Sequence, residues 1–551
     1  MLNPVIVAGG LGAVAPSRLR EAVKQFLPED ATRAEKIATI EVGLQSPLGQ
    51  SLREAMARWI VDEIVPVNAL VPEAYLKWRP PVRDAMMFVV TRLSPARLAP
   101  KLLEQLDLPP STPAEKRLLC LIAKVPGLQK LGQVIARNQH LRPALRKALT
   151  KLENGIRDVN PDDVCRIVQQ ELGDKVSKYS VQIASSILSE ASVSAVIRFT
   201  WINPVAGRRE RGVFKVLKPH IPEYFAEDMD YLQGLAQHFG DCHHTYGFPA
   251  HLIPDTFQKV RRLLRHEVNF SREQKTLLEA WPLYEELPGV KVPRLIRPLC
   301  TSKVTALSEE SGIKITSAAA RLSQVDRRRV AEQLLEALVA VPLLSSVDEA
   351  VFHGDPHAGN LLYDNRKSQL TIIDWALRER LGREQRRHLA LLFLMISLRD
   401  AAAVSSEIAA LAERPIRVGS AKEQLVRACV DKFLGEAPAK GRSSAADAMR
   451  LLERAAIQGI KFPTSLIMLS KVMFTLEGML VDIAGPDTGM GFALARHVAQ
   501  HWLANRSAYR SPLKTLDWLT LQCSALLYTG RLWIQWEQAM LNRYLPPGKT
   551  A

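Results

Sequence analysis

Three polar residues whose types suit phosphoryl transfer lie close together between residues 351 and 378. Asp355 and Asn360 have four residues between them, the spacing found in the catalytic loop of kinases. Asp374 follows an apolar run that ends at Ile373. Phosphoryl transfer needs an aspartate to orient the attacking hydroxyl and an Asn–Asp pair to hold magnesium. The spacing therefore predicts Asp355 as the catalytic aspartate, with Asn360 and Asp374 as metal ligands.

Two predicted strands must position these residues. The runs 361–363 and 369–373 have β-type apolar sequences, and the turn-forming sequence 364–368 separates them. Antiparallel pairing of the two runs would bring Asn360 and Asp374 to the same end of a hairpin. We therefore expect both side chains to share one metal-bound phosphate.

A purely structural interpretation is the alternative. In it, His353 and Asp355 form a hydrogen-bonded turn, and Asp374 caps the N-terminus of a helix. An Asp-x4-Asn pair alone is a weak signal in a chain of this length. The combination of His-Gly-Asp, a small-residue loop with Asn360, a strand pair and Ile-Ile-Asp is more specific, and it favours the phosphoryl-transfer site.

The composition is that of a folded globular protein. The chain has 551 residues, of which 47% are hydrophobic and 24% charged, and this length suits about two to four domains. Its formal net charge is +16. Such a surplus favours polyanionic partners, namely nucleotide phosphates, anionic lipid headgroups or nucleic acid. Solvated arginine-rich helices without any such partner explain the charge equally well.

The cysteines and the apolar runs indicate a reducing compartment and predict no membrane span. The six cysteines are scattered without a CxxC pair, which argues against a disulfide framework or a structural zinc site. We interpret the sequence 242–244, Cys-His-His, as a loop, with metal binding as the minor alternative. The N-terminal run 1–16 lacks a basic region, and the run 518–530 is shorter than a spanning helix. A peripheral membrane contact stays open.

The segments around the hairpin are predicted from their periodicity. Residues 82–98 are one of several helices expected in the first 120 residues. The runs 194–201 and 211–217 predict a β-hairpin whose loop is 203–211. Lys215 should point away from its apolar neighbours in the second strand, because side chains alternate across a strand. Lys218 is expected on a solvated face.

Two glutamates lie on the helix predicted at 261–278. Glu267 and Glu273 are six residues apart, so either could meet Lys215. Strands are expected at 292–296 and 303–307, followed by a long helix at 324–344. After residue 400 the chain is predicted to be helical, and its late aromatic residues Trp518, Trp533 and Trp536 favour helix packing over an interfacial membrane helix.

With these features in order, the chain resembles the UbiB-type (AarF-type) atypical kinases. The matching sequences are Lys130 to Gln133 for the KxGQ signature, Ala191, Ser192, Val193 and Ser194 for the alanine-rich nucleotide loop, Lys215 for the phosphate-contacting lysine, Glu267 for the ExD motif, Glu273 for the lysine-pairing glutamate, His353 to Asn360 for the catalytic loop, and Asp374 for the metal-binding aspartate. The resemblance runs from about residue 128 to residue 400.

The resemblance implies an α+β, mostly helical, bilobal protein-kinase-like fold with helical extensions at both ends. The expected regions are an N-terminal extension (1–120), a kinase core (121–400) made of a KxGQ segment (128–190), a small lobe (191–310) and a large lobe (311–400), and a C-terminal helical region (401–551). The resemblance also implies ATP or ADP and Mg²⁺ as cofactors. The residues expected to bind them are Lys215, 191–194, Asn360 and Asp374, and the residues expected to be catalytic are Asp355, Lys215 and Glu273. Lys130, Gln133 and Glu267 are expected to be regulatory, since the KxGQ segment packs over the active site.

The family also implies a setting in isoprenoid-quinone (ubiquinone) biosynthesis or related lipid metabolism. Expected partners are an isoprenoid lipid or an anionic membrane surface, and quinone-biosynthesis proteins, but not nucleic acid. The expected location is the cytoplasm, with peripheral attachment to the inner face of a membrane, no signal peptide and no clear transmembrane helix. Typical members behave as ATPases.

Three departures from the family pattern leave rival functions open. Glu190 replaces an alanine of the nucleotide loop, and a carboxylate near the phosphates is expected to weaken nucleotide binding. Asn269 replaces the aspartate of ExD, and Trp375 follows Asp374 where phenylalanine is usual. Trp375 also suits a small-molecule phosphotransferase of the aminoglycoside or choline kinase type, although such enzymes lack the Lys130 to Gln133 motif. A nucleotide-sensing scaffold without turnover is the third hypothesis.

Overall fold

The computed structural model describes residues 30–47, 49–71, 73–136, 159–247, 252–285, 287–345, 347–436 and 445–485, with isolated positions before residue 30 and after residue 512. The chain divides into two compact units. The first comprises Met1–Phe270 and Ile296–Leu307, and the second Ser271–Leu295 and Ser308–Ala551. The predicted aromatic stretch at Trp518, Trp533 and Trp536 lies outside the described residues. The predicted domain boundaries at residues 120 and 400 stay predictions.

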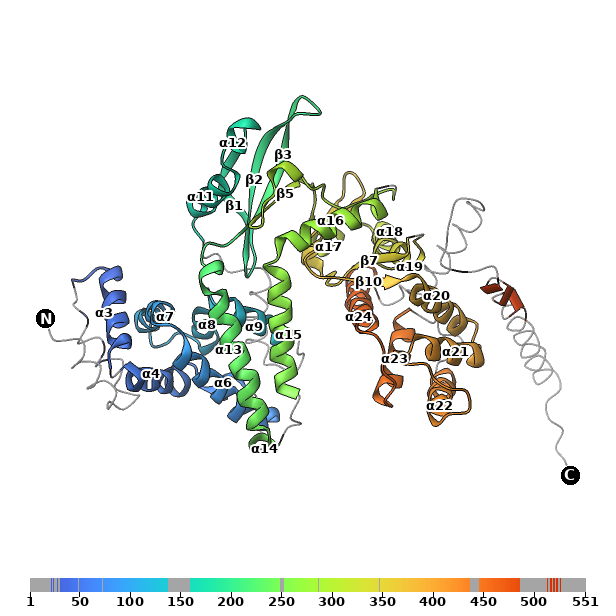
Figure 1. Cartoon of the computed structure of the whole chain (residues 1–551), viewed down its shortest axis with the longest axis horizontal. Coiled ribbons are helices and arrows are strands. Elements are labelled where there is room, and N and C mark those ends of the chain that lie inside the picture. The colour runs from blue at the N-terminus through green and yellow to red at the C-terminus, as the bar shows by residue number, and fades with distance from the viewer. Residues whose placement is uncertain are drawn as a thin grey trace. The chain divides into compact units, whose positions relative to one another are not determined.

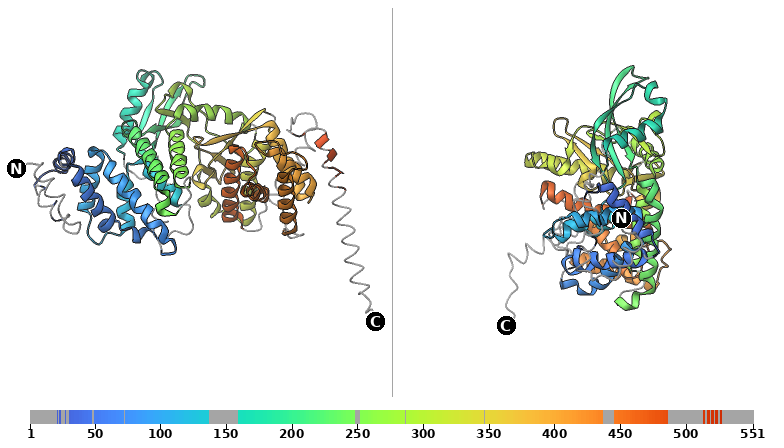
Figure 2. Two further views of the ribbon diagram at one scale, coloured as in Figure 1. Left: turned by 60° about the horizontal axis from the view of Figure 1, so that its bottom comes forward. Right: turned by 90° about the vertical axis from the view of Figure 1, so that its left-hand side faces the viewer.

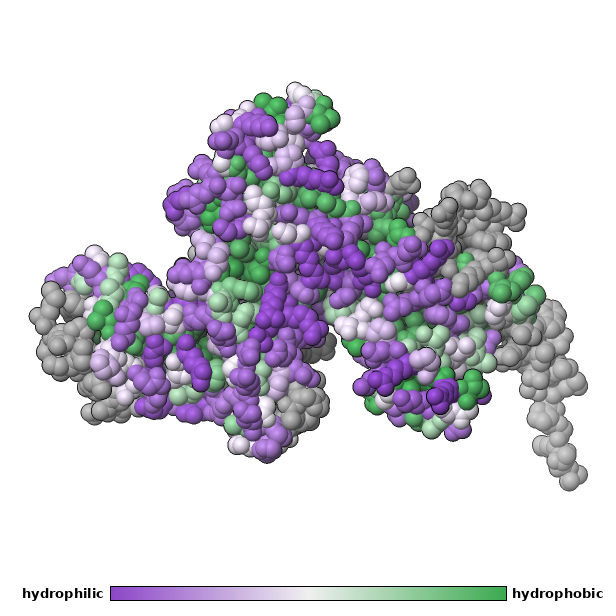
Figure 3. Space-filling model, viewed as in Figure 1, coloured by the Kyte–Doolittle hydropathy of each residue, from purple (hydrophilic) through white to green (hydrophobic). Residues whose placement is uncertain are grey.

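The first unit begins with a group of helices that share one hydrophobic core (Figure 1). These helices are α3 (Arg33–Gln45), α4 (Gly49–Arg58), which continues as the π-helix η1 (Trp59–Ile64), α5 (Val67–Leu70), the 3₁₀-helix η2 (Glu73–Trp78), α6 (Arg79–Arg92), α7 (Pro95–Asp107), α8 (Ala114–Ile122), α9 (Pro126–Ala136), α13 (Ile221–Asp241), α14 (His243–Tyr246) and α15 (Leu252–Glu267). Helix α15 shows how they pack. It buries Val260 and Leu264 and exposes Lys259, Arg262 and Arg265. Its outer face is accordingly hydrophilic (Figure 3).

The single helix predicted at 82–98 is wrong, because the chain breaks it into two. Helix α6 ends at Arg92, and α7 begins at Pro95. Ser94 between them has an extended backbone, with φ −56° and ψ 150°. A residue before proline is kept out of the α region by the proline ring, while proline itself fits the first turn of the next helix. The Ser94-Pro95 pair therefore ends one helix and starts another.

Lys101, in helix α7, is a buried lysine that should make stability depend on pH. Its Nζ donates hydrogen bonds to the carbonyl oxygens of Cys120, at 3.1 Å, and Ala123. Burial lowers the pKa of Lys101 from 10.5 to about 8. The unfolded chain keeps this proton up to its ordinary pKa, so it binds more protons than the folded protein between those two pH values. Stability from this group must therefore rise with pH across that window.

We expect the wild-type protein to gain up to about 3 kcal/mol relative to Lys101→Met as the pH rises from about 7.5 to about 10. Chemical denaturation of both proteins at each pH measures this difference, and groups that titrate in both proteins cancel. The variant Lys77→Met removes an exposed lysine of the same unit and serves as the control. A wild-type advantage that is flat or falls with pH would contradict the expectation.

The β-rich part of the first unit is a four-stranded sheet of order β1-β2-β3-β5, and α11 and α12 lie along it (Figure 2). Its elements are α11 (Pro161–Leu172), α12 (Lys175–Lys178), β1 (Gln182–Glu190), β2 (Ser194–Asn203), β3 (Arg208–Leu217), the 3₁₀-helix η4 (Arg297–Leu299) and β5 (Val304–Ser308). Val164 and Val168 of α11 share a core with Phe199, Phe214 and Val216 of the sheet. This packing fixes the face of the sheet to which each strand residue belongs.

The β2–β3 hairpin has longer strands and a shorter loop than predicted. The strands pair from Ser194↔Leu217 to Asn203↔Arg208, so the predicted loop 203–211 reduces to residues 204–207. Asn203 Oδ1 accepts hydrogen bonds from the backbone N–H groups of Val205, at 2.9 Å, and Ala206, at 3.4 Å. Gly207 adopts φ +62°, a conformation that glycine takes without strain. The turn chemistry of these residues closes the hairpin early.

The single helix predicted at 261–278 is also wrong. Helix α15 ends at Glu267, and α16 (Phe270–Tyr284) begins after a break at Val268 and Asn269. The two glutamates therefore sit on different helices, Glu267 at the end of one and Glu273 in the first turn of the next. The argument that either glutamate could meet Lys215 assumed one continuous helix, and it does not apply to two separate helices.

The second unit combines small strands with helices. It contains most of α16 and β4 (Val290–Lys291), β6 (Ile313–Lys314), α17 (Ile315–Ala319), α18 (Gln324–Leu335), the π-helix η5 (Glu336–Ala340), α19 (Val341–Leu344), β7 (Glu349–His353), the 3₁₀-helix η6 (Ala358–Asn360), β8 (Leu361–Asp364), β9 (Gln369–Ile372), β10 (Arg378–Gly382), α20 (Arg383–Ser397), α21 (Ala401–Leu411), α22 (Ala421–Glu436), α23 (Ala445–Ile457) and α24 (Thr464–Ala484). The strands form a sheet of order β4-β9-β8-β6 and a pair, β10-β7.

Most predicted elements of the second unit are confirmed, including the long helical segment at 324–344 and the late helices α22 to α24. The strand predicted at 292–296 is reduced to a single bridge at Leu295. On either side of it, the N–H of Ile296 donates to the carbonyl oxygen of Ala306 at 2.8 Å, and the N–H of Ser308 donates to that of Arg294 at 2.9 Å. The regular strand here is β4, which ends at Lys291, two residues before Pro293, and proline has no N–H to donate to a strand ladder. None of the helices in the described ranges combines the length and the apolar character that crossing a bilayer requires.

Candidate active site

The predicted hairpin exists and brings the two candidate metal ligands together. Strands β8 and β9 pair antiparallel with Leu361 opposite Ile372. One residue beyond this pair, the N–H of Ile373 donates to the carbonyl oxygen of Asn360 at 2.9 Å. Asn360 and Asp374 therefore flank the open end of the hairpin, as the sequence predicts. Asn360 is 9% exposed, whereas Asp374 is exposed.

His353 is a buried support for this loop. Its Nε2 lies 2.8 Å from the carbonyl oxygen of Asp374, and its Nδ1 lies 3.2 Å from the backbone nitrogen of Asp355. These partners require Nε2 to carry the proton and Nδ1 to accept one, so the ring is neutral. Burial lowers the pKa of His353 and thereby favours this neutral form. The ring holds the two aspartate segments in a fixed relation.

Asp374 adopts a backbone conformation that few residues other than glycine take. Its φ is +58°. Such a left-handed conformation is uncommon outside glycine, and aspartate is among the residues that tolerate it best. The next regular element is strand β10, which begins at Arg378, so the alternative of Asp374 as a helix N-cap is wrong. The loop is held instead by His353 and by Trp375, whose rings meet edge to face with centroids 5.0 Å apart.

Trp375 is a core residue rather than a sign of substrate preference. It is fully buried, and its Nε1 donates to the carbonyl oxygen of Ile372 at 3.1 Å. Packing accounts for a tryptophan at this position. It therefore gives no support to the small-molecule phosphotransferase hypothesis.

Asp355 is positioned by its neighbours in the loop. The Nδ2 of Asn360 donates to the Asp355 carbonyl oxygen at 3.0 Å, which orients the amide of Asn360. Gly354, the preceding residue, donates its N–H to the carbonyl oxygen of Leu377 at 2.9 Å. A Cβ at Gly354 would lie 3.1 Å from that same oxygen, so the close approach of the two segments favours glycine.

Lys471 is the residue of this site that the sequence analysis missed. Its Nζ lies 3.2 Å from Asp355 Oδ1, although the two residues are 116 positions apart. Lys471 lies in α24, beyond every motif of the resemblance. No local pattern marks it, because a lysine in a helix is ordinarily solvated.

The donor set of the loop suits magnesium. Asp374 offers a carboxylate and Asn360 an amide oxygen, and Mg²⁺ prefers hard oxygen ligands, often one or two from protein with the rest from water and phosphate. Across the described ranges, no group of three or more His, Cys, Asp and Glu side chains is placed to hold a metal ion. That includes the described His243 and His244, so the minor metal alternative at 242–244 gains no support.

In the first unit, the KxGQ lysine is held by the ExD glutamate. Lys130 Nζ in α9 forms an ion pair with Glu267 Oε1 at the end of α15. The other carboxylate oxygen of Glu267 accepts a hydrogen bond from Ser192 Oγ at 3.0 Å. One glutamate thus joins the α9 segment to the predicted nucleotide loop. Gln133 also lies in α9, but its side chain is outside the described part of the structure, and the regulatory roles stay predictions.

The predicted nucleotide loop is a tight turn between β1 and β2. The N–H of Ala191 donates to the carbonyl oxygen of Ser194 at 2.8 Å, and the carbonyl oxygen of Val193 accepts from the N–H of Lys218 at 3.0 Å. Ser192, Val193 and Ser194 are buried, and Ala191 is exposed. Nucleotide binding by these four residues stays a prediction.

Two expectations about the charged residues beside this loop need correction. Lys218 was expected on a solvated face, but it is 1% exposed, and its Nζ lies 3.1 Å from Glu190 Oε2. Strand β3 ends at Leu217, so strand alternation no longer determines where Lys218 points. The Glu190 carboxylate is likewise buried against Lys218. It is therefore charge-compensated, and the expectation that it weakens nucleotide binding loses its physical basis.

Lys215 and Glu273 belong to different units, so their predicted pairing stays a prediction. Lys215 is half-buried, while its neighbours Phe214 and Val216 are fully buried, as strand alternation predicts. Its Nζ lies 5.7 Å from the centroid of the Phe270 ring. Glu273 is 2% exposed in the first turn of α16.

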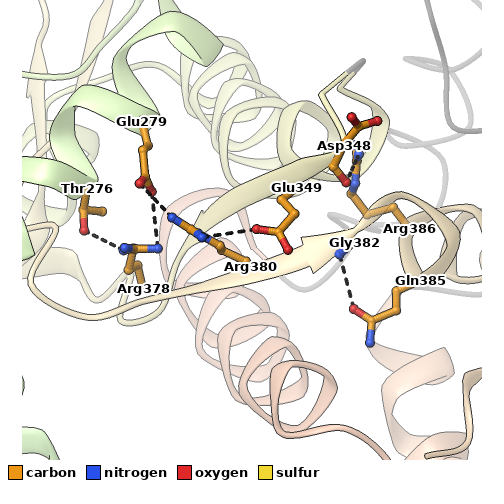
Figure 4. A network of polar contacts seen from close by, with 9 residues as sticks. All are labelled: Thr276, Glu279, Asp348, Glu349, Arg378, Arg380, Gly382, Gln385 and Arg386. Atoms are coloured by element: carbon orange, nitrogen blue, oxygen red, sulfur yellow. Dashed lines mark hydrogen bonds and ion pairs between the residues drawn. The ribbon is translucent and has the colours of Figure 1, made fainter.

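Two arginines of strand β10 hold helix α16 (Figure 4). Arg378 Nε donates to Thr276 Oγ1 at 2.6 Å, and Arg378 Nη1 lies 3.3 Å from Glu279 Oε2. Arg380 Nη2 reaches the other oxygen of Glu279 at 2.7 Å. Arg378 is four residues beyond Asp374, so the segment that carries the candidate metal ligand also fixes the helix that carries Glu273.

The candidate site lies in a mostly helical, kinase-like fold. Residues 151–408 match the ABC1 atypical kinase-like domain. This match confirms the predicted resemblance to UbiB-type atypical kinases, and the mostly helical kinase-like fold with small sheets is confirmed as well.

Individual relatives are distant. The chain is 25% identical over 357 residues to Protein ACTIVITY OF BC1 COMPLEX KINASE 7, chloroplastic, of Arabidopsis thaliana, which covers 64% of this chain and 50% of that protein. It is 23% identical over 398 residues to a probable protein kinase UbiB of Azotobacter vinelandii, covering 70% and 71% of the two chains. The match thus spans half of the Arabidopsis protein. A Mycobacterium tuberculosis protein solved in complex with erythromycin covers 65% of this chain and 87% of its own, with 17% identity and a TM-score of 0.44.

Proposed function

We propose that this protein is an ATP- and magnesium-dependent atypical kinase or ATPase of the UbiB type. The observation that carries the proposal is the loop in which Asp355, Asn360 and Asp374 are held together by His353 and the β8–β9 hairpin. Two aspartates and an asparagine arranged in this way suit phosphoryl transfer in a kinase-like domain. That reaction depends on positioning and charge neutralisation rather than on covalent chemistry by the protein.

Each residue has a defined task in this proposal. Asn360 and Asp374 hold magnesium, which when bound neutralises charge on the phosphate oxygens. Asp355 orients the attacking hydroxyl or water and accepts its proton. Lys215, supported by Glu273, and residues 191–194 hold the nucleotide. The His353 ring, through its contacts with both segments, keeps Asp355 and Asp374 in position while the nucleotide binds.

The biological setting is part of the same proposal. A role in isoprenoid-quinone biosynthesis or other lipid metabolism is what the resemblance to UbiB-type kinases implies, and the net charge of +16 suits an anionic membrane surface. We propose an isoprenoid lipid or anionic membrane surface and quinone-biosynthesis proteins as partners, with a cytoplasmic location peripheral to the inner face of a membrane. The Arabidopsis relative is named chloroplastic, so the cytoplasmic location is proposed for this chain and not for that relative.

A nucleotide-binding scaffold without turnover is the second candidate. The ion pair of Lys130 with Glu267 and the bond of Glu267 to Ser192 favour it, because they tie up polar groups of the predicted nucleotide loop. The expected behaviour of a scaffold is nucleotide binding that never leads to phosphate release.

One preparation of the full chain separates these functions. ATP and ADP binding are measured with and without magnesium, together with phosphate release, in the absence and presence of anionic liposomes. We expect magnesium-dependent binding with slow phosphate release that liposomes increase. Binding without release under every condition would replace the enzyme by the scaffold. Fast transfer to one hydroxylated metabolite in a screen would favour a small-molecule kinase.

A further inference from the structure

A lysine from the C-terminal helices reaches the catalytic aspartate. Lys471 Nζ of α24 lies 3.2 Å from Asp355 Oδ1, and the side chains are 31% and 19% exposed. Helix α24 lies outside residues 151–408, the part that matches the kinase-like domain. Both residues belong to the second unit. A segment beyond the matched kinase-like domain therefore contributes charge directly to the candidate site.

Helix α24 is fixed firmly enough to present this lysine in one place. It buries an apolar stripe that includes Leu469, Val472 and Leu476. Its C-terminal end accepts a hydrogen bond from Gln324 of α18, whose Nε2 lies 2.9 Å from the Ala484 carbonyl oxygen. This packing holds the helix backbone and thereby sets the position from which the Lys471 side chain extends.

A second ion pair ties α24 to its neighbour. Glu477 Oε2, six residues beyond Lys471, lies 2.5 Å from Arg450 Nη2 of α23. Arg450 Nη1 also lies 2.7 Å from Asp447 Oδ1 in its own helix. Rotation of α24 about its axis would break this pair. The side of α24 that presents Lys471 is therefore set by contacts at several positions.

The ion pair of Lys471 with Asp355 matters for the chemistry of the site more than for the stability of the fold. A partly exposed ion pair such as this one contributes little to folding, typically below about 1 kcal/mol. An ammonium group, however, carries three N–H donors. It can hold a carboxylate oxygen and a phosphoryl oxygen at the same time. Near Asp355, where an acceptor hydroxyl meets the phosphoryl group, such a cation offsets charge that develops during transfer.

We propose that Lys471 is a catalytic residue that bridges Asp355 and the transferred phosphoryl group. This inference rests on the proposed function. The acceptor oxygen, from water or a hydroxyl, forms a bond to the γ-phosphorus, and the bond from that phosphorus to the oxygen that bridges it to the β-phosphate breaks. The acceptor proton passes to Asp355, the electron pair of the broken bond leaves with ADP, and Lys471 donates hydrogen bonds to Asp355 and to the transferred group.

The rival role for the same ion pair is a lock. If Lys471 merely masked Asp355, removing the ammonium would free the carboxylate and raise turnover. A bridging cation makes the opposite prediction, because its removal takes away stabilisation of the transition state. The direction of the change therefore distinguishes the two roles.

The test compares Lys471→Met and Lys471→Arg with wild type and with Lys461→Met, which removes an exposed lysine just before α24. Methionine keeps the apolar stem, so packing is preserved. We expect Lys471→Met to lower kcat for magnesium-dependent ATP hydrolysis by about 100-fold with nucleotide affinity changed by less than about twofold. Lys471→Arg should recover part of the loss, and Lys461→Met should match wild type.

A chemical rescue adds a readout that packing damage would not move. In Lys471→Ala, small primary alkylammonium ions are expected to restore part of the turnover in a saturable manner, and they should not act on Asp355→Asn. Thermal melting of each variant verifies folding.

Turnover of Lys471→Met within about twofold of wild type, or above it, overturns this inference and leaves the proposed function standing. A loss of turnover in Lys471→Met that neither arginine nor alkylammonium ions relieve also overturns it, because the effect is then structural. Absence of turnover in the wild-type protein overturns the proposed function, and the inference with it.

Discussion

Replacing Asp374 by asparagine is expected to lower magnesium-dependent nucleotide turnover by about 10³-fold, in the range seen when a charge-stabilising group of a phosphoryl-transfer site is lost. Asparagine keeps the shape of the side chain and tolerates the positive φ of this position. The backbone contact with His353 uses the Asp374 carbonyl oxygen, which the substitution leaves in place. The change therefore removes one negative charge from the proposed metal site and leaves this backbone contact in place.

The measurement is phosphate release from ATP across a magnesium titration. We expect the residual activity of Asp374→Asn to require more magnesium than wild type, since one charged ligand is missing. Asp348→Asn is the matched control, because Asp348 is an exposed aspartate of the same unit whose side chain is 92% exposed. Turnover of Asp374→Asn equal to that of Asp348→Asn would remove Asp374 from the metal site.

Replacing Asp228 by asparagine is expected to destabilise the first unit by about 3–5 kcal/mol, the usual cost of leaving a buried charge without its partner. Arg97 Nη1 lies 2.6 Å from Asp228 Oδ1, in an ion pair whose atoms are not aligned as a hydrogen bond, and both side chains are nearly inaccessible to solvent. Burial raises the pKa of Asp228, and the nearby Arg97 opposes this. Glu227 is a second partner of Arg97 at 3.4 Å, but it is more exposed.

The same aspartate holds the start of the α9 segment. Asp228 Oδ2 accepts a hydrogen bond from the N–H of Gly127 at 2.8 Å, at the first turn of the helix that carries Lys130. Asparagine retains an oxygen that can accept this bond. The substitution therefore tests the buried charge pair separately from the contact to α9.

Chemical denaturation measures the loss, and two further variants control it. The double variant Arg97→Met with Asp228→Asn removes both charges and should recover most of the stability, because a buried pair replaced as a whole is often nearly neutral. Asp62→Asn breaks an exposed pair with Arg83 and should cost less than about 1 kcal/mol. An Asp228→Asn protein as stable as Asp62→Asn, or a double variant no better than the single one, would contradict this account.

Local sequence patterns determined the site loop and most of its surroundings. The turn residues 364–368 and the apolar runs on either side specify a hairpin, and strand pairing then places Asn360 beside Asp374. Lys215 lies on the opposite face of its strand from its buried neighbours for a similarly local reason, which is the alternation of side chains along a strand. Helices α22 to α24 follow from apolar periodicity. In each case the interaction joins residues close in sequence.

Errors arose where a short local feature overrode periodicity. The apolar pattern at 82–98 continues through Ser94-Pro95, yet the proline excludes the helical conformation from the residue before it. At Val268 and Asn269 the pattern also continues, but the chain starts a new helix. This second break lies between the two glutamates. Because of this break, Glu267 ends α15 and pairs with Lys130, while Glu273 lies in α16.

What the sequence by itself determined is the hairpin with its candidate site loop and the type of domain that carries it, because neighbouring residues and backbone geometry specify both. Only the tertiary structure decided which charges meet. Lys218 neutralises Glu190, and Lys471 reaches Asp355. A lone lysine carries no local sign of its partner, since the pairing depends on how packed helices and strands bring distant positions within a few ångströms. The loop that sequence predicts is thus completed by a lysine that sequence analysis could not have identified.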